Sequence, residues 1–168
     1  MMRILSTLIR SEAGNSAAEM ALVTPLLLTL MFGSFELGNY FLSEHVVVVA
    51  VRDGARYAGR RPFTDYPTCS TPTTAARDAT RNVTRTGQVD TGGTARLVGW
   101  TDDNTITVSV SCDTSASGLG GIFTGLSGGA HIVTVQATVP YHSLFQSIGL
   151  GTLGLNLSAQ SETPVMGA

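Results

Sequence analysis

The hydrophobic residues of this chain begin with one long uncharged run near the N-terminus. No Asp, Glu, Lys or Arg occurs between Met20 and Phe35, and a run of this length is too long for a strand, so it predicts a helix. A membrane span needs roughly 20 apolar residues, which the run reaches once neighbours such as Ala17 and Leu37 are included. Residues 15–42 are therefore predicted to form a transmembrane helix.

Helical spacing continues beyond residue 42, but with apolar residues on one face only. That face carries Val47, Ala50, Val51, Gly54 and Ala58. Residues 43–61 are thus predicted to be an amphipathic continuation of the same helix, which ends at Pro62. The valines at 46–49 prefer a strand by propensity, so a break at that point is the alternative.

Residues 62–168 show shorter elements and are predicted to form a separate domain. A second helix is expected from Thr73 to Thr86, because Pro72 suits a helix start and Gly87 suits a helix end. Arginines recur along this helix at i, i+4 spacing and are expected to form a solvated face, with a binding surface as the alternative. These arginines are Arg77, Arg81 and Arg85.

Alternating apolar and polar residues predict an antiparallel sheet in the rest of this domain. Strands are expected at residues 96–101, 105–112, 131–141 and 153–159, with a turn at 102–104 between the first two. A long helix, a short helix and a small antiparallel sheet together predict an α+β fold.

Charge and composition restrict the class of protein. Charged residues make up 13% of the chain, against about 25% in an average soluble domain, which agrees with a membrane-anchored protein. The formal net charge is −2, which gives no indication of nucleic acid as a partner. Arg3 and Arg10 precede the uncharged run, so the positive-inside rule places the N-terminus in the cytoplasm and residues beyond about 40 outside.

Two carboxylates lie near the ends of the predicted span. Glu19 and Glu36 are about 25 Å apart along a helix, close to the thickness of the hydrocarbon layer of about 30 Å. Both are therefore able to reach headgroups. A cleaved secretory signal is a competing interpretation of this region, but Phe35 is followed by Glu36 and Leu37 instead of a small-x-small cleavage site.

The two cysteines, Cys69 and Cys112, do not form a Cys-x-x-Cys pattern typical of a metal or redox site. Outside the cytoplasm they are able to form a disulfide, which would stabilise the domain by roughly 4 kcal/mol through loop-closure entropy. Two separate buried thiols are the alternative. The histidines at 45, 131 and 142 are scattered and indicate no catalytic triad or metal site, so no cofactor is expected.

Three segments, in order, carry a family resemblance. They are RSEAGNSAAEMALVTPLLL at 10–28, GSFELG at 33–38 and VRDGARYA at 51–58. Together they resemble the TadE-like family of pseudopilins from Flp (tight adherence, Tad) pilus systems. This resemblance implies a pilin-like α+β plan and a role in pilus assembly and adhesion, without enzymatic activity.

The resemblance also implies site residues and partners. A prepilin peptidase would remove residues 1–14 as a cytoplasmic leader by cutting between Gly14 and Asn15, and the new amine of Asn15 would pair with Glu19 of a neighbouring subunit. Other pilin subunits and the Tad machinery would be partners in the bacterial inner membrane. Subunit packing in the membrane would involve Glu19, Pro25, Gly33, Glu36 and Gly38.

Pro25 lacks an amide hydrogen and is expected to loosen the helix near residues 21–25.

A second functional class remains open from the sequence alone. It is a single-span, membrane-anchored extracytoplasmic domain that binds a ligand or has hydrolytic activity.

Overall fold

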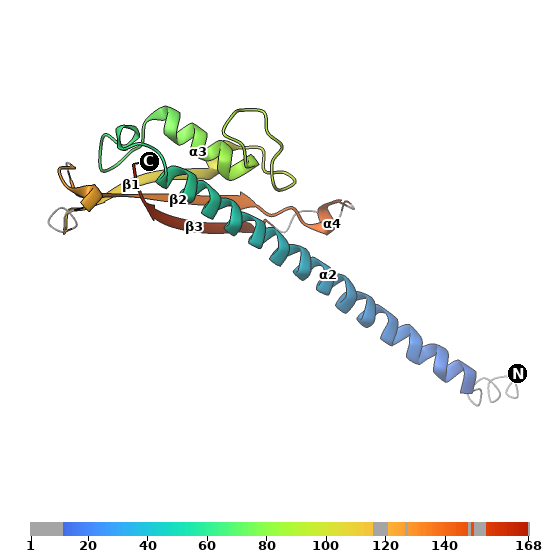
Figure 1. The fold of residues 1–168 in the computed structure, drawn as a ribbon. Coiled ribbons are helices and arrows are strands. Elements are labelled where there is room, and N and C mark those ends of the chain that lie inside the picture. Colours follow the sequence, from blue (N-terminus) through green and yellow to red (C-terminus); the bar gives the residue numbers. More distant parts are fainter. Residues whose placement is uncertain (1–11, 116–120, 127, 148, 150–153, 168) are drawn as a thin grey trace, which may run out of the picture. The chain divides into compact units, whose positions relative to one another are not determined.

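The computed structural model describes residues 12–115, 121–126, 128–147, 149 and 154–167. The chain divides into two compact units, residues 1–39 and 40–168, and the fold within each is drawn in Figure 1. Most of the predicted leader lies outside the described residues. The helices and strands are α2 (Glu12–Gly59), α3 (Thr74–Thr86), β1 (Ile106–Asp113), β2 (Ala130–Pro140), α4 (Leu144–Ser147) and β3 (Asn156–Pro164), with short 3₁₀ turns at Phe63–Asp65, Asp103–Thr105 and Gly121–Phe123.

Helix α2 is continuous over 48 residues. It passes through Pro25 without interruption, and the Thr29 hydroxyl donates to the Pro25 carbonyl oxygen at 2.8 Å. The alternative of a break in the valine run at 46–49 is wrong. Val47 is fully buried, and its packing outweighs the weak preference of valine for strands.

Strands β1, β2 and β3 form an antiparallel sheet in that order. The register pairs Val108 with Val135 and Val139 with Leu157, so apolar residues of neighbouring strands share one face. That face is buried, while the alternate positions, such as Thr107 and Gln136, are exposed. The predicted α+β class is confirmed, and so is the alternation that predicted β1 and β2.

The last turns of α2 pack on the buried face of the sheet, as Figure 1 shows for the segment that ends at Gly59. Its apolar face, predicted from helical spacing, is buried at every position from Val47 to Ala58. Trp100 and Tyr66 complete this core, each 1% exposed. Burial raises the pKa of the Tyr66 hydroxyl, which donates to the carbonyl oxygen of Ala58 at 2.7 Å.

Helix α3 has the predicted ends. The Thr73 hydroxyl accepts a hydrogen bond from the Ala76 amide, and Gly87 closes the helix, as expected for these residues. Two of its three arginines do not lie on a solvated face as predicted. Arg81 donates to the Ile106 carbonyl oxygen at 2.9 Å, which attaches α3 to β1, and Arg85 pairs with Asp103 in the turn before β1.

Two of the predicted strands need correction. Residues 96–101 form turns, because Gly99 has φ of 82°, a left-handed conformation that an extended strand does not contain. The last strand begins at Asn156 instead of Leu153 and extends to Pro164. Leu153 lies outside the described residues. Leu155, predicted to face the core, is 47% exposed.

Candidate functional site

The first part of α2 exposes apolar side chains on all sides. Between Ser16 and Leu37 every residue except Glu36 is exposed, and large side chains such as Leu22 (79%) and Leu30 (60%) are uncovered. A helix that is apolar all round belongs in an apolar surrounding. Among the described residues, one helix is long and apolar enough to cross a membrane, and it is this one.

The residues of the predicted processing site lie within the first turns of α2. The helix begins at Glu12 and includes Gly14 and Asn15, whose side chains lie outside the described residues. Glu19 follows after slightly more than one turn, and its side chain is exposed. Gly14, Asn15 and Glu19 therefore lie within about one and a half turns of one helix.

Glu36 differs from Glu19 in its surroundings. Its exposed fraction is only 8%, whereas the side chain of Glu19 is exposed. A buried carboxylate in an apolar segment is costly and is a common mark of function in membrane helices. The two acidic residues of the span are therefore not equivalent.

The predicted packing residues of the span do not share one helix face. At 3.6 residues per turn, Gly33 and Glu36 lie on the same side, whereas Gly38 is rotated by about 160° from Glu36. A side chain added at Gly33 or Gly38 would meet nothing within 4 Å. Both glycines are thus open surface, where another helix is able to approach the backbone closely.

Gly54, in the segment VRDGARYA, has the opposite surroundings. A Cβ atom there would lie 2.0 Å from the Thr84 hydroxyl oxygen, so the lack of a side chain lets α3 cross α2 at short distance. Thr84 is fully buried, and its hydroxyl donates to the Thr80 carbonyl oxygen at 2.8 Å. Glycine at 54 is required by packing within the chain.

The other residues of this segment also hold the domain together. Asp53 accepts a hydrogen bond from the Arg96 guanidinium at 2.8 Å, and Ala55 and Ala58 are buried in the core. Arg56, by contrast, is exposed. The segment at 51–58 therefore mainly attaches α2 to α3, to the turns before β1 and to the sheet.

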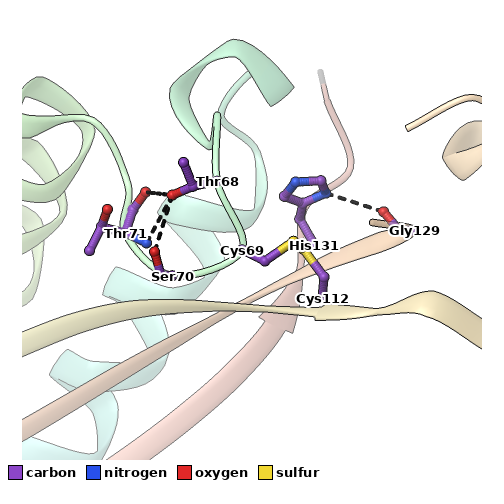
Figure 2. The surroundings of a disulfide bond; sticks show 7 residues. All are labelled: Thr68, Cys69, Ser70, Thr71, Cys112, Gly129 and His131. Carbon is purple, nitrogen blue, oxygen red and sulfur yellow. Dashed lines mark hydrogen bonds between the residues drawn. A yellow bond between two sulfur atoms is a disulfide. The ribbon is translucent and has the colours of Figure 1, made fainter. Parts of the chain in front are cut away.

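The structure pairs Cys69 with Cys112 in a disulfide, shown in Figure 2. The bond joins the loop before α3 to the end of β1 and closes a separation of 43 residues. Gly128, with φ of 92°, lies against it, and a Cβ atom there would be 2.7 Å from the Cys69 sulfur. The disulfide therefore fastens the loop and α3 to the sheet at one end of β1.

A histidine stands beside the disulfide in Figure 2. His131 is buried, and its Nδ1 lies 3.2 Å from the Gly129 carbonyl oxygen, which can only accept, so Nδ1 carries the proton. The ligand atoms of Cys69, Cys112 and His131 lie within 4.8 Å of one another. With both sulfurs in the disulfide, neither is a thiolate, the form that binds metal ions.

A polar groove of about 450 Å³ lies between α3 and the turn at residues 101–104. Its charged groups are engaged in the fold: Asp78 pairs with Arg77 and Asp103 with Arg85. The Asp102 carboxylate accepts a hydrogen bond from the Asn104 amide at 2.8 Å. These side chains stabilise the local structure, and the arrangement offers no reactive pair of the kind used in hydrolysis.

Comparison with known families identifies the first part of the chain. Residues 14–56 match the family model described as TadE-like protein, so the N-terminal region of this chain is similar to that family. The match starts at Gly14, includes Glu19 and ends within the segment at 51–58, which leaves residues 57–168 outside it. No curated protein and no solved structure was found to match the chain.

Proposed function

We propose, from the TadE-like N-terminal region, that this protein is a non-enzymatic pseudopilin or minor pilin. It would act in assembly of a Flp-type (Tad) pilus, and so in surface adhesion, by packing its N-terminal helix against other subunits. The observation that carries the proposal is the first part of α2, which lies in the matched region and has apolar side chains exposed on all sides.

In this proposal, residues 15–42 cross the bacterial inner membrane with the N-terminus in the cytoplasm. Residues 43–61 continue the helix outside, and residues 62–168 form the extracytoplasmic α+β domain. The disulfide between Cys69 and Cys112 favours this orientation, because disulfides persist in oxidising compartments. Arg3 and Arg10, which precede the span, agree with a cytoplasmic N-terminus.

Processing would generate a positive charge for Glu19 of a neighbouring subunit to pair with. A carboxylate among apolar helices costs several kcal/mol unless a positive group satisfies it. Cutting between Gly14 and Asn15 by a prepilin peptidase creates an α-amino group on Asn15. Pairing of this amine with Glu19 of a neighbouring subunit would fix the stagger between two helices. Glu36, Gly33, Gly38 and Pro25 are the further residues proposed to contact other subunits.

The partners that follow are the prepilin peptidase, other pilin-like subunits and the Tad assembly machinery in the membrane. The open surface at Gly33 and Gly38 supports helix-to-helix contacts on more than one side of the span. Such contacts suit a subunit surrounded by neighbours.

Substitution of Glu19 tests the proposal. In Glu19→Gln the negative charge is lost with little change in size, so the mature chain should be processed yet fail to copurify with its partner subunits, and adhesion should be lost. Glu44→Gln is the matched control, because it makes the same change on the same helix beyond the span. Normal assembly and adhesion of Glu19→Gln would disprove the amine pairing.

A further inference from the structure

One end of the second unit gathers aromatic and apolar residues. Tyr40 is the first residue of that unit, and the rings of Tyr40 and Tyr141 meet edge to face with centroids 5.2 Å apart. The Tyr141 amide donates to the Leu155 carbonyl oxygen at 2.9 Å. Leu144 follows shortly after Tyr141 as the first residue of α4. These contacts bring the end of β2 and the approach to β3 next to Tyr40.

Four apolar side chains at this end are exposed. Phe41 is 57% exposed and Leu42 71%, while Leu144 and Leu155 are 46% and 47% exposed. The sequence contains no charged residue from 37 to 43 and none from 143 to 161. Such a gathering of exposed apolar side chains on a folded domain commonly marks a surface that contacts a membrane or another protein.

The connection of this end to the predicted span indicates that it meets the membrane surface. Helix α2 is continuous from Glu19 to Tyr40 and rises about 32 Å between them, which matches a hydrocarbon thickness of about 30 Å. If Glu19 lies at the cytoplasmic face, Tyr40 emerges at the outer face. Tyrosine is enriched at this level of membrane proteins, where its ring is apolar and its hydroxyl reaches water.

We propose that this end of the domain rests on the membrane, with its side chains inserted at the boundary between headgroups and acyl chains. The apolar end is formed by the exposed side chains of Phe41, Leu42, Leu144 and Leu155, beside the half-buried ring of Tyr40, which packs on the buried Tyr141. Its partner is lipid of the same bilayer that α2 crosses, so the inference rests on the membrane-spanning part of the proposed function. The domain would touch the lipid at two points, through Phe41 and Leu42 on the helix and through Leu144 and Leu155. Contact at both points would restrict tilting of the domain on its anchor.

The opposite end of the sheet provides an internal control. Ile122 is also an exposed apolar residue, at 53%, and it lies in the connection between β1 and β2. Figure 1 shows this connection and α4 at opposite ends of the sheet. Since β2 runs from Ala130 to Pro140, the two ends are about 30 Å apart at the usual rise of a strand.

Quenching of tryptophan fluorescence by lipid tests this inference. The full chain is reconstituted in phosphatidylethanolamine and phosphatidylglycerol vesicles, with or without acyl chains brominated either close to the headgroup or near the chain end, so that both depths of the layer are sampled. The variants are Leu144→Trp, Leu155→Trp, Ile122→Trp and, within the span, Leu28→Trp. The native Trp100, which is 1% exposed, also fluoresces. Its signal is measured in the unsubstituted chain and subtracted from that of each variant.

We expect brominated lipid to reduce the added fluorescence of Leu144→Trp, Leu155→Trp and Leu28→Trp, but not that of Ile122→Trp. Quenching at Leu28→Trp without quenching at Leu144→Trp and Leu155→Trp would overturn the surface contact and leave the span intact. Blue-shifted emission at those two positions without quenching would indicate a protein partner instead, and would also overturn it. An unquenched Leu28→Trp would contradict the membrane span itself.

Discussion

The two parts of helix α2 place similar residues in opposite surroundings. Before Tyr40, side chains such as Leu22 and Leu30 are exposed, whereas beyond it Val47 and Val51 are fully buried. The first part is apolar all round, and the second is apolar on one side and charged on the other. The distribution of apolar residues around the helix, more than their number, therefore separates the surface suited to lipid from the surface covered by the sheet.

Removing the disulfide should have the largest effect on the second unit. Replacing Cys69 and Cys112 by serine frees a loop of 43 residues, so loop-closure entropy predicts a loss of about 4 kcal/mol in the free energy of unfolding. Denaturation in detergent, followed by near-UV circular dichroism of the buried Trp100, measures this loss. Helical signal from the span should persist. An unchanged midpoint would show that the disulfide does not stabilise the domain.

Truncation of one apolar side chain in each part of α2 sharpens the comparison. Val51→Ala removes two buried carbon atoms and leaves a cavity, so the unfolding free energy of the domain should fall by about 2 kcal/mol. Leu28→Ala removes more carbon atoms from the exposed part and should not change it. The same denaturation experiment compares them. Equal losses of unfolding free energy in the two variants would contradict the claim that the first part of α2 does not stabilise the domain.

Adding a methyl group at glycine tests packing in the same way. Gly54→Ala would place its Cβ atom 2.0 Å from the Thr84 hydroxyl oxygen. Overpacking of this kind costs about 1–3 kcal/mol, and alanine returns about 1 kcal/mol of helix propensity, so a net loss of up to about 2 kcal/mol is expected. Gly38→Ala, where the surroundings are open, is the control and should leave thermal stability of the domain unchanged.

The smallest expected effect concerns the ion pair between Asp53 and Arg96. Both side chains are partly exposed, at 36% and 24%, so Asp53→Asn should reduce the unfolding free energy by at most about 1 kcal/mol. The loss should shrink further in high salt, because salt screens partly exposed charges. Thermal unfolding at low and high salt measures both. A larger, salt-independent loss would mean that Asp53 has a further structural role.

Much of the fold follows from local signals in the sequence. The end signals at Thr73 and Gly87 predicted α3 closely, because caps act within one turn of the helix. The alternation in 105–112 and 131–141 predicted which side chains of β1 and β2 face the core. The all-round apolar character of residues 20–35 predicted a helix suited to a membrane. Each of these features depends on residues close together in the chain.

Features that depend on distant contacts were missed. The segment at 96–101 alternates like a strand, but Gly99 turns the chain so that Trp100 enters the core and its indole donates to Thr105 at 2.8 Å. The arginines of α3 looked solvated because Ile106 and Asp103, their partners, lie far along the sequence.

Processing at Gly14 is the central claim, and the intact mass and N-terminal sequence of the membrane-extracted chain test it most directly. The measurement is made with and without a co-expressed Flp-type prepilin peptidase. The account predicts an N-terminus at Asn15 that appears only with the peptidase. A chain that retains Met1 in its presence, or one cut after Phe35, would contradict it and favour an anchored or secreted domain of another function.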